Sequence, residues 1–234
     1  ENLEKKKKEE VSKKSEKDSK KSEEKPYFEV YWKDRLRVKT KDEKVSMSIG
    51  GRIQLDVGFV HEDASIRENI EKIDDYAEFR AVRLDMRGTL YKYFTYRMFL
   101  DFSDGVKFKD VYIGLTKLPL NGKLYIGYMR EPFGLEAMTS AACTTFMERT
   151  SNISFTPGRN FGVRFLGYEP DMRIHIGLGV FNETVNDDPP EITDGGAYSF
   201  TGRICISPWY ENKGEKLFHL GVAYSFRNPR NSTV

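Results

Sequence analysis

The sequence predicts an all-β protein, an antiparallel transmembrane β-barrel that carries one long loop. Apolar and polar residues alternate along segments that exceed the roughly 5 to 6 residues common in soluble strands. Short turns and long connections also alternate along the chain. Barrels of the bacterial outer membrane have this plan, with short turns at one rim and longer loops at the other.

The clearest strand covers 45–60, VSMSIGGRIQLDVGFV. Most odd positions are apolar, whereas the even positions include Ser, Arg, Gln and Asp. Because successive side chains of a strand point to opposite faces, one face is apolar and the other polar. We therefore expect about ten strands, this one and nine similar segments. The nine are 36–40, 76–90, 93–103, 107–117, 122–130, 160–169, 171–182, 196–206 and 216–227.

Two residues break the alternation. Arg80 falls on the apolar parity of 76–90, which predicts either a β-bulge near Arg80 and Ala81 or a position of Arg80 near the rim, where a charge costs less, and we favour the bulge. Phe99 falls on the polar parity of 93–103.

The long connections lie at 61–75, 131–159 and 182–196. The second of them begins with EPFGLE and ends with TPGR, so Pro and Gly mark both of its ends.

Composition limits the other function classes. The chain has 234 residues and a formal net charge of +2, which gives no global sign of nucleic-acid binding. No apolar run approaches the roughly 20 residues of a membrane-spanning helix. A soluble β-rich binding protein would need a second apolar layer against the apolar face, and the pattern predicts none. Residues 1–26 are mostly Lys, Glu and Ser, and we expect a charged disordered tail there.

The sequence predicts neither an enzyme nor a metal or cofactor site. The three histidines, His61, His175 and His219, do not have the spacing of metal ligands. No nucleophile elbow and no phosphate-binding P-loop is present. The two cysteines, Cys143 and Cys205, form neither a disulfide framework nor a metal site.

Six motifs resemble, in their order, those of the phosphate-selective porin O/P family. They are GGRIQLD, GYMREPFGLE, FMERTS, PGRNFGV, GLGVFNE and HLGVAYSFR. The resemblance implies a porin-type barrel of about 16 strands, usually a homotrimer, whose long loop folds into the pore and narrows it. With about ten strands, residues 27–234 would be the N-terminal part of that barrel, in a chain truncated at its C-terminus.

The resemblance also implies a location and partners. The location is the outer membrane of a Gram-negative bacterium, with contacts to lipid and lipopolysaccharide and with the N-terminal tail in the periplasm. The solutes are small anions of the phosphate class.

Arginine is the side chain best suited to such solutes, because its planar guanidinium stays charged and forms paired hydrogen bonds with phosphate. Strand parity places these arginines on the lumen face: Arg52, Arg83, Arg87, Arg97, Arg164, Arg173 and Arg203. It places these acids there too: Asp56, Asp85, Asp101, Asp110 and Glu131. The excess of positive charge is modest.

The family's pore residues are only partly kept. Arg52, Arg80 and Arg149 match pore or loop arginines, and Ser140 keeps one of two loop serines. The family's phosphate-binding lysine corresponds to Ala137, and a pore aspartate corresponds to Lys109. We therefore expect an anion path with a weaker preference for phosphate. The alternatives are a general, non-selective porin lined by ion pairs, or a non-functional barrel fragment.

Overall fold

The computed structural model describes residues 27–61, 74–171, 173–187, 190–192 and 197–228. The tail predicted at 1–26 lies outside the described residues, so its disorder stays a prediction. Parts of the connections at 61–75 and 182–196 lie outside them as well.

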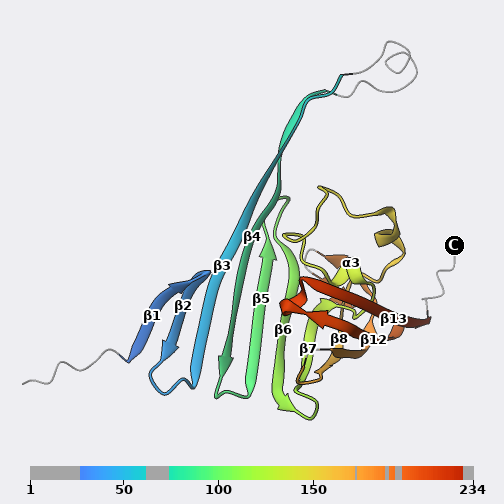
Figure 1. Ribbon diagram of the computed structural model, residues 1–234. Coiled ribbons are helices and arrows are strands. Elements are labelled where there is room, and N and C mark those ends of the chain that lie inside the picture. Colours follow the sequence, from blue (N-terminus) through green and yellow to red (C-terminus); the bar gives the residue numbers. More distant parts are fainter. Residues whose placement is uncertain (1–26, 62–73, 172, 188–189, 193–196, 229–234) are drawn as a thin grey trace, which may run out of the picture.

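One antiparallel sheet of eleven strands makes up most of the described chain (Figure 1). Each strand pairs with the next in the sequence, except that β9 pairs with β12. The strands are β1 (Phe28–Lys33), β2 (Arg35–Thr40), β3 (Val45–Gly58), β4 (Tyr76–Leu90), β5 (Phe94–Asp101), β6 (Lys107–Leu118), β7 (Gly122–Arg130), β8 (Arg159–Tyr168), β9 (Ile174–Asn182), β12 (Tyr198–Glu211) and β13 (Lys216–Asn228). A separate hairpin consists of β10 (Thr184–Asp187) and β11 (Pro190–Ile192).

The predicted all-β, antiparallel fold is confirmed. The sheet is open in this chain, with β1 and β13 at its edges, and it curls so that β12 and β13 turn toward the side where the long loop lies (Figure 1). The short turns gather at one end of the strands and the longer connections at the other. None of the described helices is long and apolar enough to cross a membrane.

The sheet has one strand more than the ten or so expected, because β1 was not predicted, and the small β10–β11 hairpin lies within the connection predicted at 182–196. Only Asp34 separates β1 from β2, in the left-handed conformation at φ 63°, so no turn sequence marks the boundary. The strand predicted at 196–206 also continues to Glu211. A register shift between Ile206 and Trp209 accommodates Pro208, and pairing with β13 resumes after it.

The bulge predicted near Arg80 is confirmed. Gln54 pairs with Ala81 and Leu55 pairs with Phe79, so Arg80 is the extra residue on β4. The extra residue shifts the alternation by one position, which brings the guanidinium of Arg80 to Asp56 on the inner face, at 3.1 Å.

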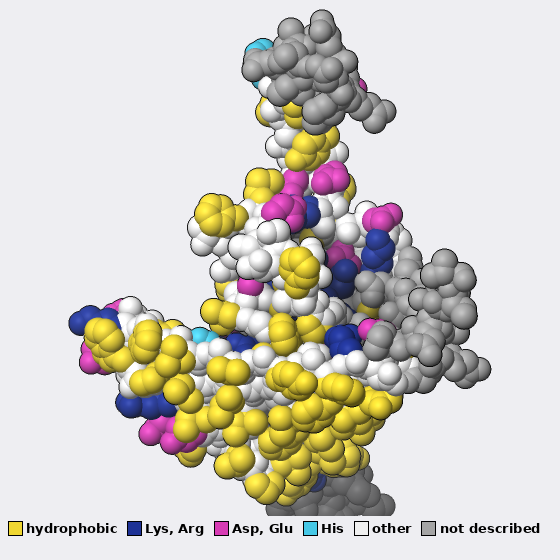
Figure 2. Space-filling view, turned by 90° about the vertical axis from the view of Figure 1, so that its right-hand side faces the viewer, with side chains coloured by type: hydrophobic (Ala, Val, Ile, Leu, Met, Phe, Trp, Pro, Cys, Tyr) yellow, Lys and Arg dark blue, Asp and Glu magenta, His cyan; other side chains and the backbone are white. Residues whose placement is uncertain are grey.

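The two faces of the sheet have opposite character. One row of apolar residues in register crosses the outer face, and 42–66% of each is exposed. The row consists of Ile113, Ile126, Val163, Val180, Phe200 and Phe226. Figure 2 shows the belt of apolar side chains to which such rows contribute. The buried polar residues of the inner face include Asp56, Asp85, Asp101, Asp110, Arg164 and Thr201. This is the reverse of a soluble core and is the arrangement of a membrane barrel.

Glu131, the first residue after β7, ties the start of the long loop to three other strands. Only 1% of Glu131 is exposed. Its carboxylate accepts hydrogen bonds from Asn160 Nδ2 at 2.7 Å on β8 and from the hydroxyls of Ser199 and Thr201 on β12. Arg227 Nη2 on β13 donates at 2.7 Å and completes the cluster. The buried charge is therefore both paired and hydrogen-bonded, as burial in a low-dielectric site requires.

Ile126→Arg would place a charge in the middle of the outer apolar row. We expect a loss of about 2 to 4 kcal/mol in the free energy of unfolding, the cost of an arginine near the midplane of a bilayer. Gln54→Arg, on the inner face, should be tolerated. Denaturant unfolding of the complete protein in lipid bilayers measures both variants. Equal losses would contradict the assignment of the two faces.

Glu131→Ala would remove the acceptor of Asn160, Ser199 and Thr201 and one of the two carboxylates that pair with Arg227. We expect a loss of about 3 to 5 kcal/mol in the same unfolding measurement, because several buried polar groups lose their partner at once. Glu183→Gln is the matched control, since Glu183 also pairs with Arg227, at 3.1 Å, but is more exposed. The control should lose at most about 1 kcal/mol. Similar small losses in both would show that the Glu131 cluster does not stabilise the fold.

Candidate functional site

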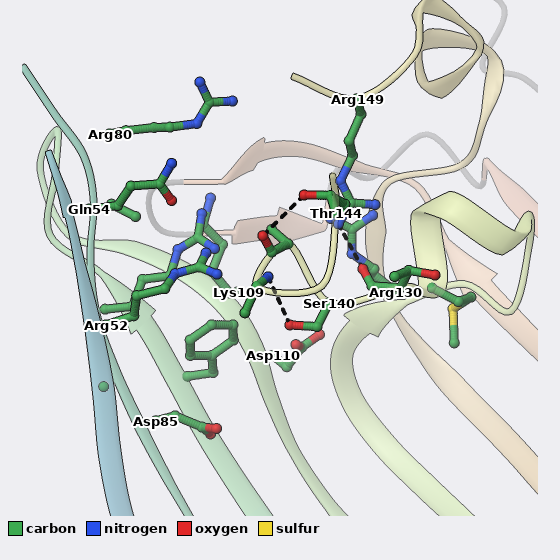
Figure 3. A pocket seen from close by; sticks show the side chains of 18 of the residues that line it. Arg52, Gln54, Arg80, Asp85, Lys109, Asp110, Arg130, Ser140, Thr144 and Arg149 are labelled. Carbon is green, nitrogen blue, oxygen red and sulfur yellow. Dashed lines mark hydrogen bonds between the residues drawn. The ribbon is translucent and has the colours of Figure 1, made fainter. Parts of the chain in front are cut away.

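A cavity of about 1040 Å³ separates the inner face of the sheet from the long loop at 131–159 (Figure 3). Its wall consists of side chains from β2 to β8, and the loop residues 138–149 supply most of its other side. In Figure 3, Arg52 and Arg80 extend from the β3–β4 wall, whereas Ser140 and Arg149 lie on the opposite side. The predicted long loop therefore lies over the inner face of the sheet and narrows the space beside it.

The loop holds its own shape through contacts between its two halves. Gly134 adopts φ 68° and leads into a short helix, α3 (Leu135–Met138), and a 3₁₀ turn, η1 (Ser151–Phe155), lies near its end. Arg149 donates hydrogen bonds to the carbonyl oxygens of Glu136 and Thr139. Thr150 donates to the Glu136 carboxylate through its hydroxyl and its N–H, which holds the pKa of that carboxyl below its usual value.

A continuous chain of ion pairs crosses the wall of the cavity. Arg97 on β5 contacts Asp85 at 2.8 Å and Asp110 at 3.2 Å. Arg35 on β2 pairs with Asp85, and Arg159 on β8 pairs with Asp110, both at 3.2 Å. The result is an alternating series of three arginines and two aspartates whose charges largely cancel.

A second wall cluster surrounds Asp101 at the end of β5. Arg83 contacts Asp101 at 2.7 Å, and Lys109 lies 4.0 Å from the same carboxylate. Phe99 also lies on this face, and its ring centroid is 4.7 Å from the guanidinium carbon of Arg97. The contact explains why an aromatic residue occupies a polar position of the strand, because a ring face attracts a guanidinium.

Two arginines of the cavity wall, Arg52 and Arg130, have no carboxylate partner in the described part of the chain. Within the described part of the chain, no acidic oxygen lies within 4.0 Å of either guanidinium, although every other lining Arg or Lys except Arg149 has such a partner. The Nε of Arg52 is buried and has no hydrogen-bond partner there. These two guanidiniums therefore leave donors available to an anion in the cavity.

Arg80 differs from the other arginines of the wall because one of its two carboxylate partners belongs to the loop. Asp56, on the adjacent strand β3, lies 3.1 Å away. Glu148, in the loop, lies 2.5 Å away. The hydrogen bond from Arg80 holds the pKa of the Glu148 carboxyl below its usual value. The loop and the wall are therefore joined across the cavity by one ion pair.

The structure brings together seven of the eleven residues that the sequence predicted for the anion path. Those that line the cavity are Arg52, Arg80, Arg83, Arg97, Lys109, Ser140 and Arg149. Arg87 lines a separate cavity of about 380 Å³ with Arg37 and Lys39. Arg164 is buried, donates to the carbonyl oxygen of Arg130 at 2.8 Å and faces the ring of Tyr125. Arg173 and Arg203 line neither cavity.

Sequence reasoning missed three lining arginines, Arg35, Arg130 and Arg159. Arg35 has the parity of the inner face of β2, so extending the predicted strand by one residue would have found it. Arg130 and Arg159 pair in register at the foot of the loop, within the quoted motifs YMREPFGLE and PGRNFG. Their positions in the alternation of β7 and β8 are those of outer-face residues. They form the last pair of this ladder, however, so no further row of side chains fixes the direction in which they point.

Among the described residues, no group of three His, Cys, Asp or Glu is arranged to hold a metal ion.

Comparison with known proteins supports the family resemblance that the sequence motifs indicated. The family model for phosphate-selective porin O and P matches residues 47–234. Porin O of Pseudomonas aeruginosa is 27% identical over 210 residues, which cover 84% of this chain. The chain spans 45% of the length of that relative. The eleven-stranded antiparallel sheet, with its apolar outer face and polar inner face, agrees with a porin barrel. Because the family model also covers most of the chain, the chain belongs to the phosphate-selective porin O and P family.

Proposed function

We propose that the complete protein containing this chain is an outer-membrane porin that passes small anions of the phosphate class. The path runs through the cavity between the wall and the loop at 131–159. The observation that carries the proposal is the charge of the lining. Eight arginines and one lysine line the cavity, against three acidic residues. Asp56 and Asp101 do not line the cavity but pair with the lining cations Arg80 and Arg83. They reduce the excess of positive charge without cancelling it.

The free guanidiniums are the chemical basis of the proposed selectivity. An anion that enters a narrow site loses part of its water, and N–H donors with positive charge must replace it. Arg52 and Arg130 offer such donors without competition from a carboxylate in the described chain. A cation at the same place would meet uncompensated positive charge in a site of reduced dielectric constant. Anions are therefore favoured over cations.

The same geometry supports a weak preference for phosphate. Ala137, at the position of the family's phosphate-binding lysine, is buried and uncharged. Arg149 uses two of its N–H groups within the loop. We therefore assign Arg149 to holding the loop as well as to the potential of the cavity, and Arg52 and Arg130 to direct contact with the anion.

The wider setting follows from the family. We propose a location in the outer membrane of a Gram-negative bacterium and assembly as a homotrimer, with lipid and lipopolysaccharide around the apolar belt. Phe28, at the start of β1, pairs with Thr40 beside a short turn. Short turns of such barrels face the periplasm, so the N-terminal tail would begin there. The family is one of channels, and we propose no enzymatic activity and no cofactor.

A general, non-selective porin is the second candidate. The ion-paired series from Arg35 to Arg159 favours it, because neutralised charges line the pore without attracting either kind of ion strongly. The two candidates differ in the contribution of the free arginines, which a recording of single channels can measure.

Arg52→Ala should shift the ratio of chloride to potassium permeability toward potassium by roughly 3- to 10-fold. The estimate takes a unit charge about 10 Å from the ion path at an effective dielectric constant of about 20 to 40, which is worth about 1 kcal/mol. Arg80→Ala and Arg149→Ala should shift it in the same direction, Arg80→Ala by less, because two carboxylates already offset the charge of Arg80. The measurement is the reversal potential of the complete protein in planar bilayers under a salt gradient, with and without added phosphate.

Arg173→Ala is the matched control, since Arg173 does not line the cavity, and it should leave the ratio nearly unchanged. Phosphate should block chloride current only weakly in the parent. Unchanged ion preference in all three variants would show that these arginines are structural and that the pore is a general one.

A further inference from the structure

Arg80 is the lining cation whose two carboxylate partners differ most in exposure. Asp56 lies on the neighbouring strand, is buried and contacts Arg80 at 3.1 Å. Glu148 lies in the irregular part of the loop, and 77% of its side chain is exposed. The first contact is part of the wall, whereas the second spans the cavity.

Glu148 is unusual among the acids of this site. The other carboxylates that pair with lining cations belong to strands: Asp56, Asp85, Asp101 and Asp110. In the described chain, Glu148 is the one loop carboxylate in this role. A strand carboxylate cannot leave its arginine without disturbing the sheet, but an exposed loop side chain can rotate away.

A carboxylate and a phosphate compete for the same guanidinium donors, because both present oxygens that match the planar fork. Glu148 therefore occupies Arg80 as an entering anion would. Exposed ion pairs contribute only about 0 to 1 kcal/mol, so a dissolved anion can displace this one. If Glu148 leaves, Asp56 still holds the guanidinium at the wall of the cavity.

We propose that Glu148 is a tethered competitor that occupies Arg80 and so lowers the affinity of the constriction for anions. The proposal deepens the proposed anion-porin function and rests on it. Glu148 is then a specificity-determining residue: Asp56 positions the guanidinium of Arg80, and Glu148 sets the affinity with which an anion binds to it.

The root of the loop and the contacts between its two halves do not involve this pair. Glu131 ties its start to β8, β12 and β13, and Arg149 joins its halves through Glu136 and Thr139. Neutralising Glu148 therefore removes the competitor and leaves the loop in place. An effect of the variant on anions can be read as competition for Arg80 rather than as collapse of the constriction.

Glu148→Gln in the complete protein is the test, with inorganic phosphate as the probe. We expect the concentration of phosphate that half-blocks chloride current to fall roughly 2- to 5-fold, the range that corresponds to an exposed ion pair. Asp104→Asn is the matched control, because it removes the same charge from an exposed loop outside the cavity, where Asp104 pairs with Lys107 at 2.6 Å. The control should leave phosphate block unchanged.

A double-mutant cycle separates competition from a general loss of negative charge. In the Arg80→Ala background, adding Glu148→Gln should leave phosphate block nearly unchanged, since no guanidinium remains to be released. An equal gain with and without Arg80 would overturn the proposal and assign the effect to the field of the pore. No change on Glu148→Gln in an anion-selective parent would also overturn it. A parent without anion preference would overturn the proposed function, and this proposal with it.

Discussion

The geometry of the constriction depends on the hydrogen bonds and the ion pair that the buried carboxylate of Glu131 forms. The long loop leaves the sheet at this residue, and its carboxylate receives hydrogen bonds from β8, β12 and β13. A charge with almost no exposure is stable only when its partners are complete, so the strands and the root of the loop position one another. With the root in place, the contacts among Arg149, Thr150 and Glu136 carry the loop across the inner face of the sheet.

The sheet around this point has its polarity reversed, and that reversal accounts for the chemistry of the cavity. Apolar rows face outward, as the lipid-facing rows of a membrane barrel do, and the inner face carries the charged residues. Arginines and aspartates from neighbouring strands then lie close enough to pair, as in the series that runs through Arg97. Most of the positive charge is neutralised in this way, so the proposed selectivity for anions depends on the few guanidiniums that have no carboxylate partner.

The wall of the constriction therefore combines three kinds of arginine. Those of the wall series are held by strand carboxylates and mainly stabilise the sheet. Arg52 and Arg130 lack such partners in the described chain and provide donors for a solute. Arg80 belongs to neither group, since one partner is fixed and the other comes from the loop. Arginines that line one cavity thus have different surroundings, and the difference lies in the number of their carboxylate partners and in the element that carries each partner.

The sequence alone determined the strands, their faces and one irregularity of the sheet. Alternation is a local property of residues two apart, so the lumen parity of Arg52 and the bulge at Arg80 could be predicted without a structure. The strand β1 escaped because only Asp34 separates it from β2, and no turn sequence marked the boundary. Pairing was decided by the tertiary structure alone. Register and the path of the loop bring Glu148 to Arg80 and Glu131 to Arg227, and they leave Arg52 without a carboxylate. These contacts join residues far apart in the chain. The periodicity of the sequence gives the face of each residue but not the distant residue that it contacts.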